Sequence, residues 1–289
     1  MTAVEAPTQL LLELEAAGPK SAPRAKVRTY VPDNRPIRPW VVAFWRACVV
    51  VAIVGGWEVG ARLGAVNTFY WSSPSRILAK AAQQFASGTL WGDIAFTLTS
   101  AASGFLLGTV AGTCLGLSFW WSRLYAKTAE PFIVMFEAIP KLALAPIVVL
   151  VLGIGMSSKI AMATAMVMAV QALGAAAGVR QVDRDLVRML ASLGARRGKI
   201  FRSVVVPSTL PWLISGLRVT IGLALAGAIV GEFIGSQRGL GRLIVYAGSV
   251  YDIALIWVGV FVLALLSVAL YLIVGFAERR LASTILASN

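Results

Sequence analysis

The chain has 289 residues, of which 58% are hydrophobic and 13% are charged, whereas a soluble domain has about a quarter charged residues. This composition indicates an integral membrane protein, and the absence of histidine excludes a Ser-His-Asp triad, a histidine-ligated metal and a histidine proton relay. The formal charge of +13 does not indicate nucleic-acid binding, because most basic residues flank apolar segments, where they fix the orientation of a membrane protein.

Residues 1–39 predict a cytoplasmic N-terminal arm rather than a signal peptide. The apolar run at residues 10–12 is too short for a signal and is followed by Glu13 and Glu15. Residues 4–17 could form one amphipathic helix, and the prolines that follow favour an extended or disordered chain. Six basic residues precede the first apolar span, so we expect the N-terminus in the cytoplasm. We favour a flexible tail that touches anionic membrane lipid, and a docking role for the arm is the alternative.

Six apolar segments approach or exceed the roughly 20 helical residues that a bilayer needs. They cover residues 40–61, 94–119, 131–152, 159–179, 204–234 and 254–277, and the first part of the fifth, up to Trp212, is expected to lie outside the membrane or to tilt at the two prolines. Outside them we predict a short helix after Ser73, a tight turn from Gly153 to Ser158, and an external glycine-rich segment at 235–253. Both termini are then cytoplasmic, and only a minority of Lys and Arg, Lys159 among them, falls outside, as the positive-inside rule requires.

Small residues recur within the spans and predict how the helices pack. Glycines repeat every fourth residue at Gly104, Gly108, Gly112 and Gly116, and alanines do so at Ala161, Ala165 and Ala169. Such ridges let another helix approach closely, and we favour packing within the chain over a homodimer seam. Glu58 and Arg62 are four residues apart and can pair on one helix face. Cys48 and Cys114 lie in apolar segments and are expected to pack rather than form a disulfide.

The longest polar interruption between the spans covers residues 180–212. It carries seven basic residues up to residue 202, which indicates a cytoplasmic location. Gly194 permits a sharp turn, and Pro207 is expected to break the helical run after it. Apolar residues precede the glycine at helical spacing, at Leu186, Val187, Leu190 and Leu193. Two short helices around a glycine, with one apolar face, predict a docking surface for another protein. A basic loop that only binds lipid would explain the arginines but not the spacing.

This stretch resembles the cytoplasmic coupling loop, or EAA loop, of bacterial ABC importer permeases, in which a glycine and a downstream proline lie at fixed spacing, as Gly194 and Pro207 do. A second match is the sequence AIPKLALAP at 138–146 followed by Gly-Ile-Gly at 153–155. It is typical of permeases for nitrate, aliphatic sulfonates, taurine and related molecules. The resemblance covers residues 70–280. One departure is Arg188, which stands where the family has a glutamate, followed by Met189 and Leu190 in place of alanines.

The resemblance implies an all-α, integral membrane, type I ABC importer permease with six transmembrane helices, of which five form the core and the first is peripheral. Residues 40–289 would form the permease domain in the bacterial inner membrane. The partners implied are a second copy of the chain in a homodimer, two ABC ATPase subunits and an extracytoplasmic substrate-binding protein. The chain would be a transport subunit rather than an enzyme, with ATP and Mg in the partner ATPase and no cofactor of its own. The residues expected in the ATPase-coupling loop are Asp185, Leu186, Arg188, Ala191, Leu193, Gly194, Ala195, Arg197 and Pro207.

Charged residues inside the spans are the candidates for the translocation pathway, because charge at that depth costs about 2.5–3.5 kcal/mol per residue. Lys141 and Arg218 are the candidates for touching an anionic substrate, and Glu137, Pro140 and Glu232 complete the predicted set. The alternative is structural. Lys141 would then pair with Glu137 and Arg218 with Glu232, since buried charges are normally paired.

By resemblance, the substrate is a small, anionic solute such as a sulfonate, taurine, nitrate or an aromatic carboxylate. Two other classes remain open. A secondary transporter or channel would work alone, but no inverted repeat or membrane-embedded acidic or histidine relay is evident. A membrane enzyme would need a catalytic set, and none is visible. The run at 194–200 is one residue too short for a phosphate-binding loop and has no Ser or Thr after Lys199, so we expect no ATP binding by this chain.

Overall fold

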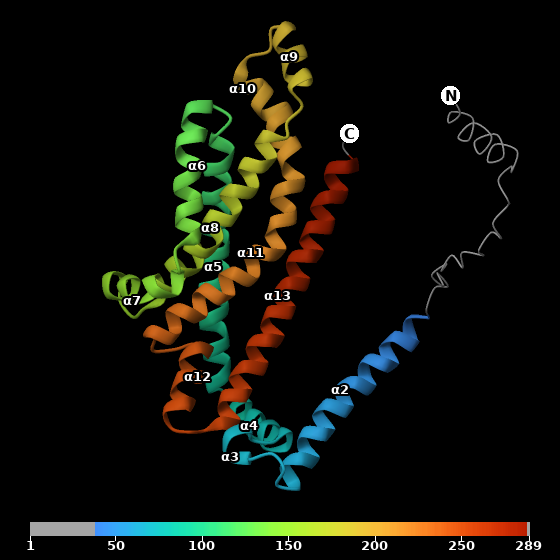
Figure 1. Ribbon diagram of the computed structural model, residues 1–289, viewed down its shortest axis with the longest axis vertical. Coiled ribbons are helices and arrows are strands. Elements are labelled where there is room, and N and C mark those ends of the chain that lie inside the picture. Colours follow the sequence, from blue (N-terminus) through green and yellow to red (C-terminus); the bar gives the residue numbers. More distant parts are fainter. Residues whose placement is uncertain (1–37, 288–289) are drawn as a thin grey trace, which may run out of the picture. The chain divides into compact units, whose positions relative to one another are not determined.

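The computed structural model describes residues 38–287, and every element in that range is a helix (Figure 1). Most of the predicted N-terminal arm, residues 1–37, lies outside this range. Backbone contacts divide the chain into residues 1–50 and 51–289, and the described part of the first unit is the beginning of α2. The helices are α2 (Pro39–Arg62), α3 (Thr68–Trp71), α4 (Pro74–Ala86), α5 (Thr89–Ser118), α6 (Arg123–Ala138), α7 (Lys141–Leu152), α8 (Met156–Arg180), α9 (Arg184–Ser192), α10 (Arg197–Ile200), a π-helical turn η1 (Phe201–Val205), α11 (Val206–Ile234), α12 (Leu240–Ser249) and α13 (Ile253–Ala287).

Within the described range, five helices are long and apolar enough to cross a membrane, and a sixth span results if α6 and α7 count as one bent pair. The span predicted for residues 131–152 is therefore broken, because α6 and α7 differ in direction by 91°. Ile139 and Pro140 are extended between them, with ψ of 129° and 96°. Proline has no N–H and disfavours a helical conformation in the preceding residue, so the chain turns at this point.

The glycine ridge of α5 packs against α8. A Cβ added at Gly112 would lie 2.4 Å from the Met168 carbonyl oxygen, and one at Gly116 would lie 2.3 Å from that of Ala172. The two backbones are thus in direct contact, as small residues on membrane helices allow, and packing within the chain is confirmed. The predicted alanine ridge of α8 is only partly correct, because Ala163 faces α5 while Ala161 and Ala165 are half-buried.

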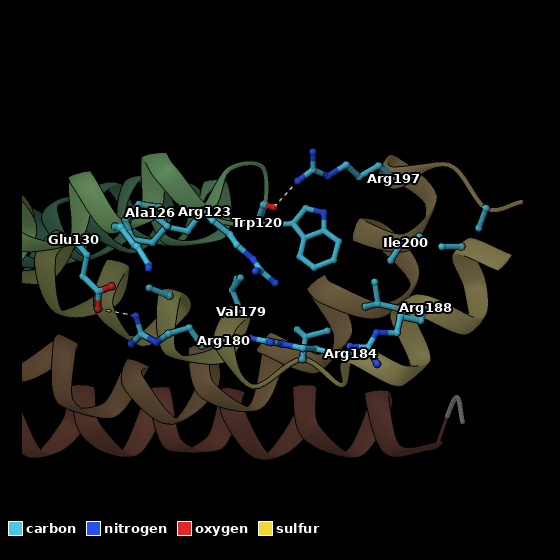
Figure 2. A pocket seen from close by; sticks show the side chains of 17 residues that line it. Trp120, Arg123, Ala126, Glu130, Val179, Arg180, Arg184, Arg188, Arg197 and Ile200 are labelled. Carbon is cyan, nitrogen blue, oxygen red and sulfur yellow. Dashed lines mark hydrogen bonds and ion pairs between the residues drawn. The ribbon is translucent and has the colours of Figure 1, made fainter.

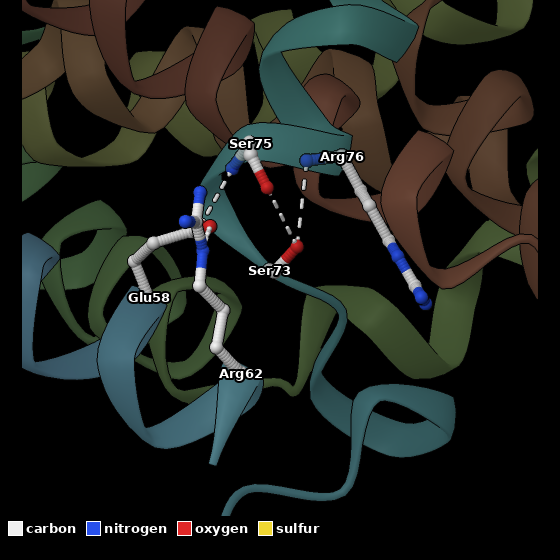
Figure 3. Close-up of polar contacts among 5 residues, drawn as sticks. All are labelled: Glu58, Arg62, Ser73, Ser75 and Arg76. Atoms are coloured by element: carbon white, nitrogen blue, oxygen red, sulfur yellow. Dashed lines mark hydrogen bonds and ion pairs between the residues drawn. The ribbon is translucent and has the colours of Figure 1, made fainter. Parts of the chain in front are cut away.

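The predicted helix after Ser73 is α4, and it is attached to the end of α2 (Figure 3). Glu58 accepts hydrogen bonds from Arg62 Nε at 2.8 Å and from the Ser75 backbone N–H at 3.0 Å. The predicted pair of Glu58 with Arg62 is therefore confirmed. Ser73 caps α4 by accepting from the Arg76 N–H at 3.4 Å.

Residues 235–253 contain helix α12, which a glycine-rich composition does not predict. It packs against α4 and α13 through an apolar cluster whose buried members include Leu240, Leu243 and Leu255. Figure 1 shows α4 and α12 at one end of the bundle, and α9, α10 and the start of α6 at the opposite end. The predicted coupling-loop residues lie at the α9–α10 end, and the predicted pathway residues lie on α6, α7 and α11 and in the bend between α6 and α7.

Candidate functional site

Helix α9 begins and ends with defined caps. The Asp183 carboxylate accepts hydrogen bonds from the backbone N–H groups of Asp185 at 2.8 Å and Leu186 at 3.4 Å, which satisfies donors that the first turn leaves free. At the other end, Gly194 has φ +79° and would meet no atom within 4 Å if it carried a Cβ. Glycine is needed here for its backbone conformation rather than for space.

The turn around Gly194 is a Schellman motif. The Gly194 N–H donates to the Ala191 carbonyl and the Ala195 N–H donates to the Leu190 carbonyl, both at 3.0 Å. Helix α10 follows from Arg197. The prediction of helices on both sides of a glycine is confirmed, but only the first is short, because the helix that begins at Arg197 runs on to Ile234.

Pro207 does not end a helix, contrary to the sequence prediction. It is the second residue of α11, directly after the π-helical turn η1. In that turn the Val206 N–H donates to the carbonyl of Phe201, five residues back. Proline cannot donate to the carbonyl four residues back, and its ring clashes with it, so a wider turn lets the helix continue through this position.

The apolar stripe of α9 divides into a packed side and an exposed side. Val187 and Leu190 pack against a cluster that includes Ile200 and Val204. Leu186, Met189 and Leu193 remain exposed, by 39%, 52% and 75%. We call these three residues the apolar edge. Large apolar side chains gathered on an exposed short helix mark an interaction surface.

Two arginines of the predicted coupling loop make contacts within the chain. Arg197 donates from Nη2 to the carbonyls of Trp120 at 3.1 Å and Trp121 at 2.8 Å, and its guanidinium lies 5.7 Å from the Trp121 ring. Arg188 pairs with Asp185 at 3.2 Å, with 77% and 88% of the two side chains exposed. Arg197 therefore ties α10 to the turn between α5 and α6, whereas Arg188 and Asp185 stay accessible.

A hollow of about 910 Å³ lies beside this segment, between α9, α10 and the neighbouring ends of α6 and α8 (Figure 2). Arg180 of α8 and Glu130 of α6 form an ion pair of 2.6 Å at its edge. The hollow is rich in basic side chains, so this end of the bundle combines an exposed apolar edge with a positively charged recess.

The predicted pathway residues lie in three separate places. At the bend between α6 and α7, the buried Lys141 donates from Nζ to Glu137 Oε2 at 2.8 Å and to the Glu137 carbonyl at 2.9 Å. Pro140 lies in the same bend. The predicted ion pair of Lys141 with Glu137 is confirmed.

Arg218 of α11 pairs with Glu278 of α13, so the predicted pairing with Glu232 is wrong. Its guanidinium also lies 5.8 Å from the ring of Tyr271, another α13 residue. The sequence could not single out Glu278, because it comes after the apolar run of the last span and 60 positions beyond Arg218.

Glu232 belongs to a buried network that caps α12. Its carboxylate accepts from Thr97 Oγ1 at 2.8 Å and from the Gly241 N–H at 2.7 Å. Thr97 Oγ1 also accepts from the Leu240 N–H at 2.9 Å, and the Asp93 carboxylate accepts from the Gly239 N–H at 2.7 Å. Three backbone donors at the start of α12 are thus satisfied by side chains of α5 and α11, two of them carboxylates, which also suit the positive end of a helix dipole.

Residues 104–285 match the family model described as "Binding-protein-dependent transport system inner membrane component". The chain belongs to this family. The riboflavin transport system permease protein RibX of Chloroflexus aurantiacus is 33% identical over 225 residues, which cover 78% of this chain and 84% of that protein. The taurine permease TauC of Escherichia coli is 29% identical over 230 residues, covering 78% and 84%. The putative aliphatic sulfonates permease SsuC of Bacillus subtilis is 27% identical over 271 residues, covering 94% and 97%.

The fold has a solved counterpart. An inward-facing structure of the MetNI methionine ABC transporter aligns with a TM-score of 0.53 and 22% identity, covering 69% of this chain and 95% of that one. The chain is therefore a type I ABC transporter permease, a multi-pass membrane protein of a binding-protein-dependent family. Permeases of this kind are transport subunits, and the ATPase is a separate chain.

The sequence prediction placed Lys159 among the external basic residues and did not predict its burial. Lys159 is fully buried. Its Nζ donates to the Ile154 carbonyl at 2.8 Å, to Ser158 Oγ at 3.1 Å and to the Gly235 carbonyl. It therefore joins the start of α8 to the turn between α11 and α12. In the sequence it resembles any lysine that flanks a span, because one of its backbone acceptors lies 76 positions away.

Proposed function

We propose that this permease is the membrane subunit of an ATP-driven importer in the bacterial inner membrane. Two copies would form the pathway, two ABC ATPase subunits would dock on the α9–α10 segment, and a substrate-binding protein would deliver the solute from outside. ATP and Mg would bind to the ATPase subunits. The observation that carries the proposal is the apolar edge, because its three exposed side chains need a partner in a chain of this family.

The distribution of charge supports a cytoplasmic position for the α9–α10 end. The start of α6 and the charged end of α13 lie at the same end of the bundle as α9 and α10 in Figure 1. These segments contribute Arg123, Lys127, Arg279 and Arg280 in addition to the seven basic residues at 180–202. Basic residues beside spans favour the cytoplasmic side, so both termini of the permease would be cytoplasmic.

The connections of α9 provide a route for coupling. The Schellman turn fixes α9 on α10, and the helical chain from Arg197 runs on to Ile234 through the π-helical turn. Arg197 also ties this segment to the turn between α5 and α6. A displacement of α9 by the ATPase subunits would therefore move α11 and α6 together. Both helices carry residues of the predicted pathway, namely Glu137, Arg218 and Glu232.

For the substrate, we propose a small, anionic solute, with a sulfonate, taurine, nitrate and an aromatic carboxylate as the classes to test. Support comes from relatives named for taurine and aliphatic sulfonates. Lys141 and Arg218 already hold Glu137 and Glu278, so an anion that contacted them would have to displace a carboxylate. Transport of this panel by Lys141→Met and Arg218→Met variants tests their pathway role, which intact transport would contradict.

A first test of docking is co-purification of the tagged permease with the ATPase encoded beside it. Leu193→Asp is expected to abolish co-purification, because a charge replaces an apolar side chain that the ATPase would cover. Leu63→Asp is the matched control, since Leu63 is exposed by 78% and lies after α2, away from α9. Retained ATPase in the Leu193→Asp variant would contradict docking on the apolar edge. Transport by vesicles that contain only the wild-type permease would instead identify a self-sufficient carrier.

A further inference from the structure

The basic hollow beside α9 has a strong excess of positive charge. Six basic residues and one acidic residue line it, a formal excess of five. They come from separate elements that the fold brings together, α6, α8, α9 and α10. The basic residues are Arg123, Lys127, Arg180, Arg184, Arg188 and Arg197, and the acidic one is Glu130.

Three of these six cations have neither an acidic partner nor a hydrogen-bond acceptor within the described residues. Arg180 pairs with Glu130, Arg188 pairs with Asp185, and Arg197 binds the Trp120 and Trp121 carbonyls. Within residues 38–280, the side chains of Arg123, Lys127 and Arg184 form no ion pair or hydrogen bond.

The two unpaired arginines line the same hollow from different helices. Figure 2 shows Arg123, at the start of α6, and Arg184, at the start of α9, on two sides of it. Like charges that line one recess repel one another, so an anion among them is stabilised. Guanidinium groups match the oxygens of a phosphate through paired hydrogen bonds.

The rest of the lining distinguishes a lipid phosphate from a soluble one. The hollow also has apolar walls, which begin where the apolar helices α5 and α8 end. A headgroup phosphate on the basic residues would leave the glycerol and upper acyl chains against this surface. Basic pockets between transmembrane helices on the cytoplasmic side have this combination and bind anionic lipid headgroups. The apolar residues are Phe119, Ala126, Ala176, Val179, Val182 and Ile200 among others.

We propose that this hollow binds the phosphate headgroup of an anionic phospholipid from the cytoplasmic leaflet, held by Arg123, Lys127 and Arg184. The assignment of the leaflet rests on the proposed orientation of the importer. The bound phosphate links α6 to α9, so the lipid fixes the segment that carries the apolar edge. Anionic lipid would then be a specific ligand of the coupling segment and not only part of the bilayer around it.

The test is native mass spectrometry of the full-length permease in detergent, with added phosphatidylglycerol or phosphatidylcholine. The wild type is expected to retain phosphatidylglycerol with at least tenfold preference. The variant Arg123→Gln, Lys127→Gln, Arg184→Gln is expected to lose that preference, because each basic residue near an anionic headgroup contributes about fivefold in affinity. The matched control Arg76→Gln, Arg238→Gln, Arg242→Gln removes three basic residues from the α4 and α12 end and should bind as the wild type does.

Equal retention of both lipids by the wild type would overturn the proposal, whatever the variants do. Unchanged preference in a triple variant that stays monodisperse would also overturn it. Displacement of the lipid by millimolar inorganic phosphate would assign the recess to a soluble anion and contradict the lipid source. The measurement contains no ATPase and no transported solute, so its outcome is independent of the importer proposal.

Discussion

The two ends of the helical bundle hold their polar residues in opposite settings. At the α12 end, Lys159, Glu232 and Thr97 are buried. Thr97 of α5 donates to Glu232 of α11 and accepts from the N–H of Leu240, and Lys159 of α8 donates to the carbonyl of Gly235. At the α9–α10 end, Arg188 and Asp185 are exposed next to uncovered apolar side chains. The buried polar groups of the first end find their partners inside the chain, whereas the charged pair of the second end is exposed.

The buried network fixes how the helices of the α12 end are arranged, whereas α9 presents an exposed surface. A buried polar network holds its elements in one arrangement, because each unpaired group costs free energy. The turn between α11 and α12 is held in this way by α5 and α8. The α9 helix is held instead by its caps and one packed side, and its other side stays exposed.

The largest effect on stability is expected for Lys159→Met. This change leaves the acceptors at Ile154, Ser158 and Gly235 without their buried donor, which should lower the free energy of unfolding by about 3 kcal/mol or more. Thermal unfolding of the detergent-solubilised protein measures it. Lys80→Met is the control. Lys80 pairs with Asp252 at 2.6 Å while both side chains remain more than a quarter exposed, so its loss should cost less than about 1 kcal/mol. Equal losses of unfolding free energy in the two variants would contradict the claim that the buried Lys159 contacts stabilise the fold more than the partly exposed Lys80–Asp252 pair does.

An intermediate effect is expected for Thr97→Val, which keeps the shape of the side chain. Glu232 loses a donor and the Leu240 N–H loses an acceptor, at a cost of about 1–3 kcal/mol. Faster amide exchange at the start of α12 should accompany the loss. Thr99→Val is the control, because the exposed Thr99 hydroxyl only donates to carbonyls of its own helix. Unchanged exchange at α12 in the Thr97 variant would show that the network does not hold this helix.

The smallest effect on stability is expected for Gly194→Ala. A residue with a Cβ at φ +79° costs about 1–2 kcal/mol, and the loss should be confined to the turn. Hydrogen exchange at 190–196 should accelerate and ATPase coupling should fall, while the unfolding temperature changes little. Gly198→Ala tests the same substitution in α10, where a Cβ meets nothing within 4 Å and the backbone needs no glycine. Equal behaviour of the two variants would contradict the role of the Gly194 turn.

The sequence predicts the parts of this fold that depend on local patterns. Apolar runs locate α2, α5, α8 and α13, and the spacing of glycines indicates the contact between α5 and α8. The Gly194 turn is predictable because only glycine readily adopts its backbone conformation. Each of these features follows from residues that are close together in the chain.

The parts that the sequence does not predict depend on distant contacts. From the sequence alone, Pro140 is compatible either with a mild kink in one continuous span or with the 91° bend that the structure has. Helix α12 is capped by side chains more than 140 positions away, at Asp93 and Thr97, so its glycine-rich sequence resembles a loop. The partner of Arg218 is a second example, because Glu278 lies on another helix.

The measurement that most directly tests the docking claim is cysteine labelling at the apolar edge. Leu193→Cys, in a Cys48→Ala and Cys114→Ala background, would be treated with a membrane-impermeant maleimide in open membrane fragments, with and without the ATPase subunit. We predict that the ATPase protects Leu193→Cys and leaves Leu63→Cys fully reactive. Equal labelling of Leu193→Cys in both conditions, in membranes where the ATPase is bound, would contradict the claim that it covers the apolar edge of α9.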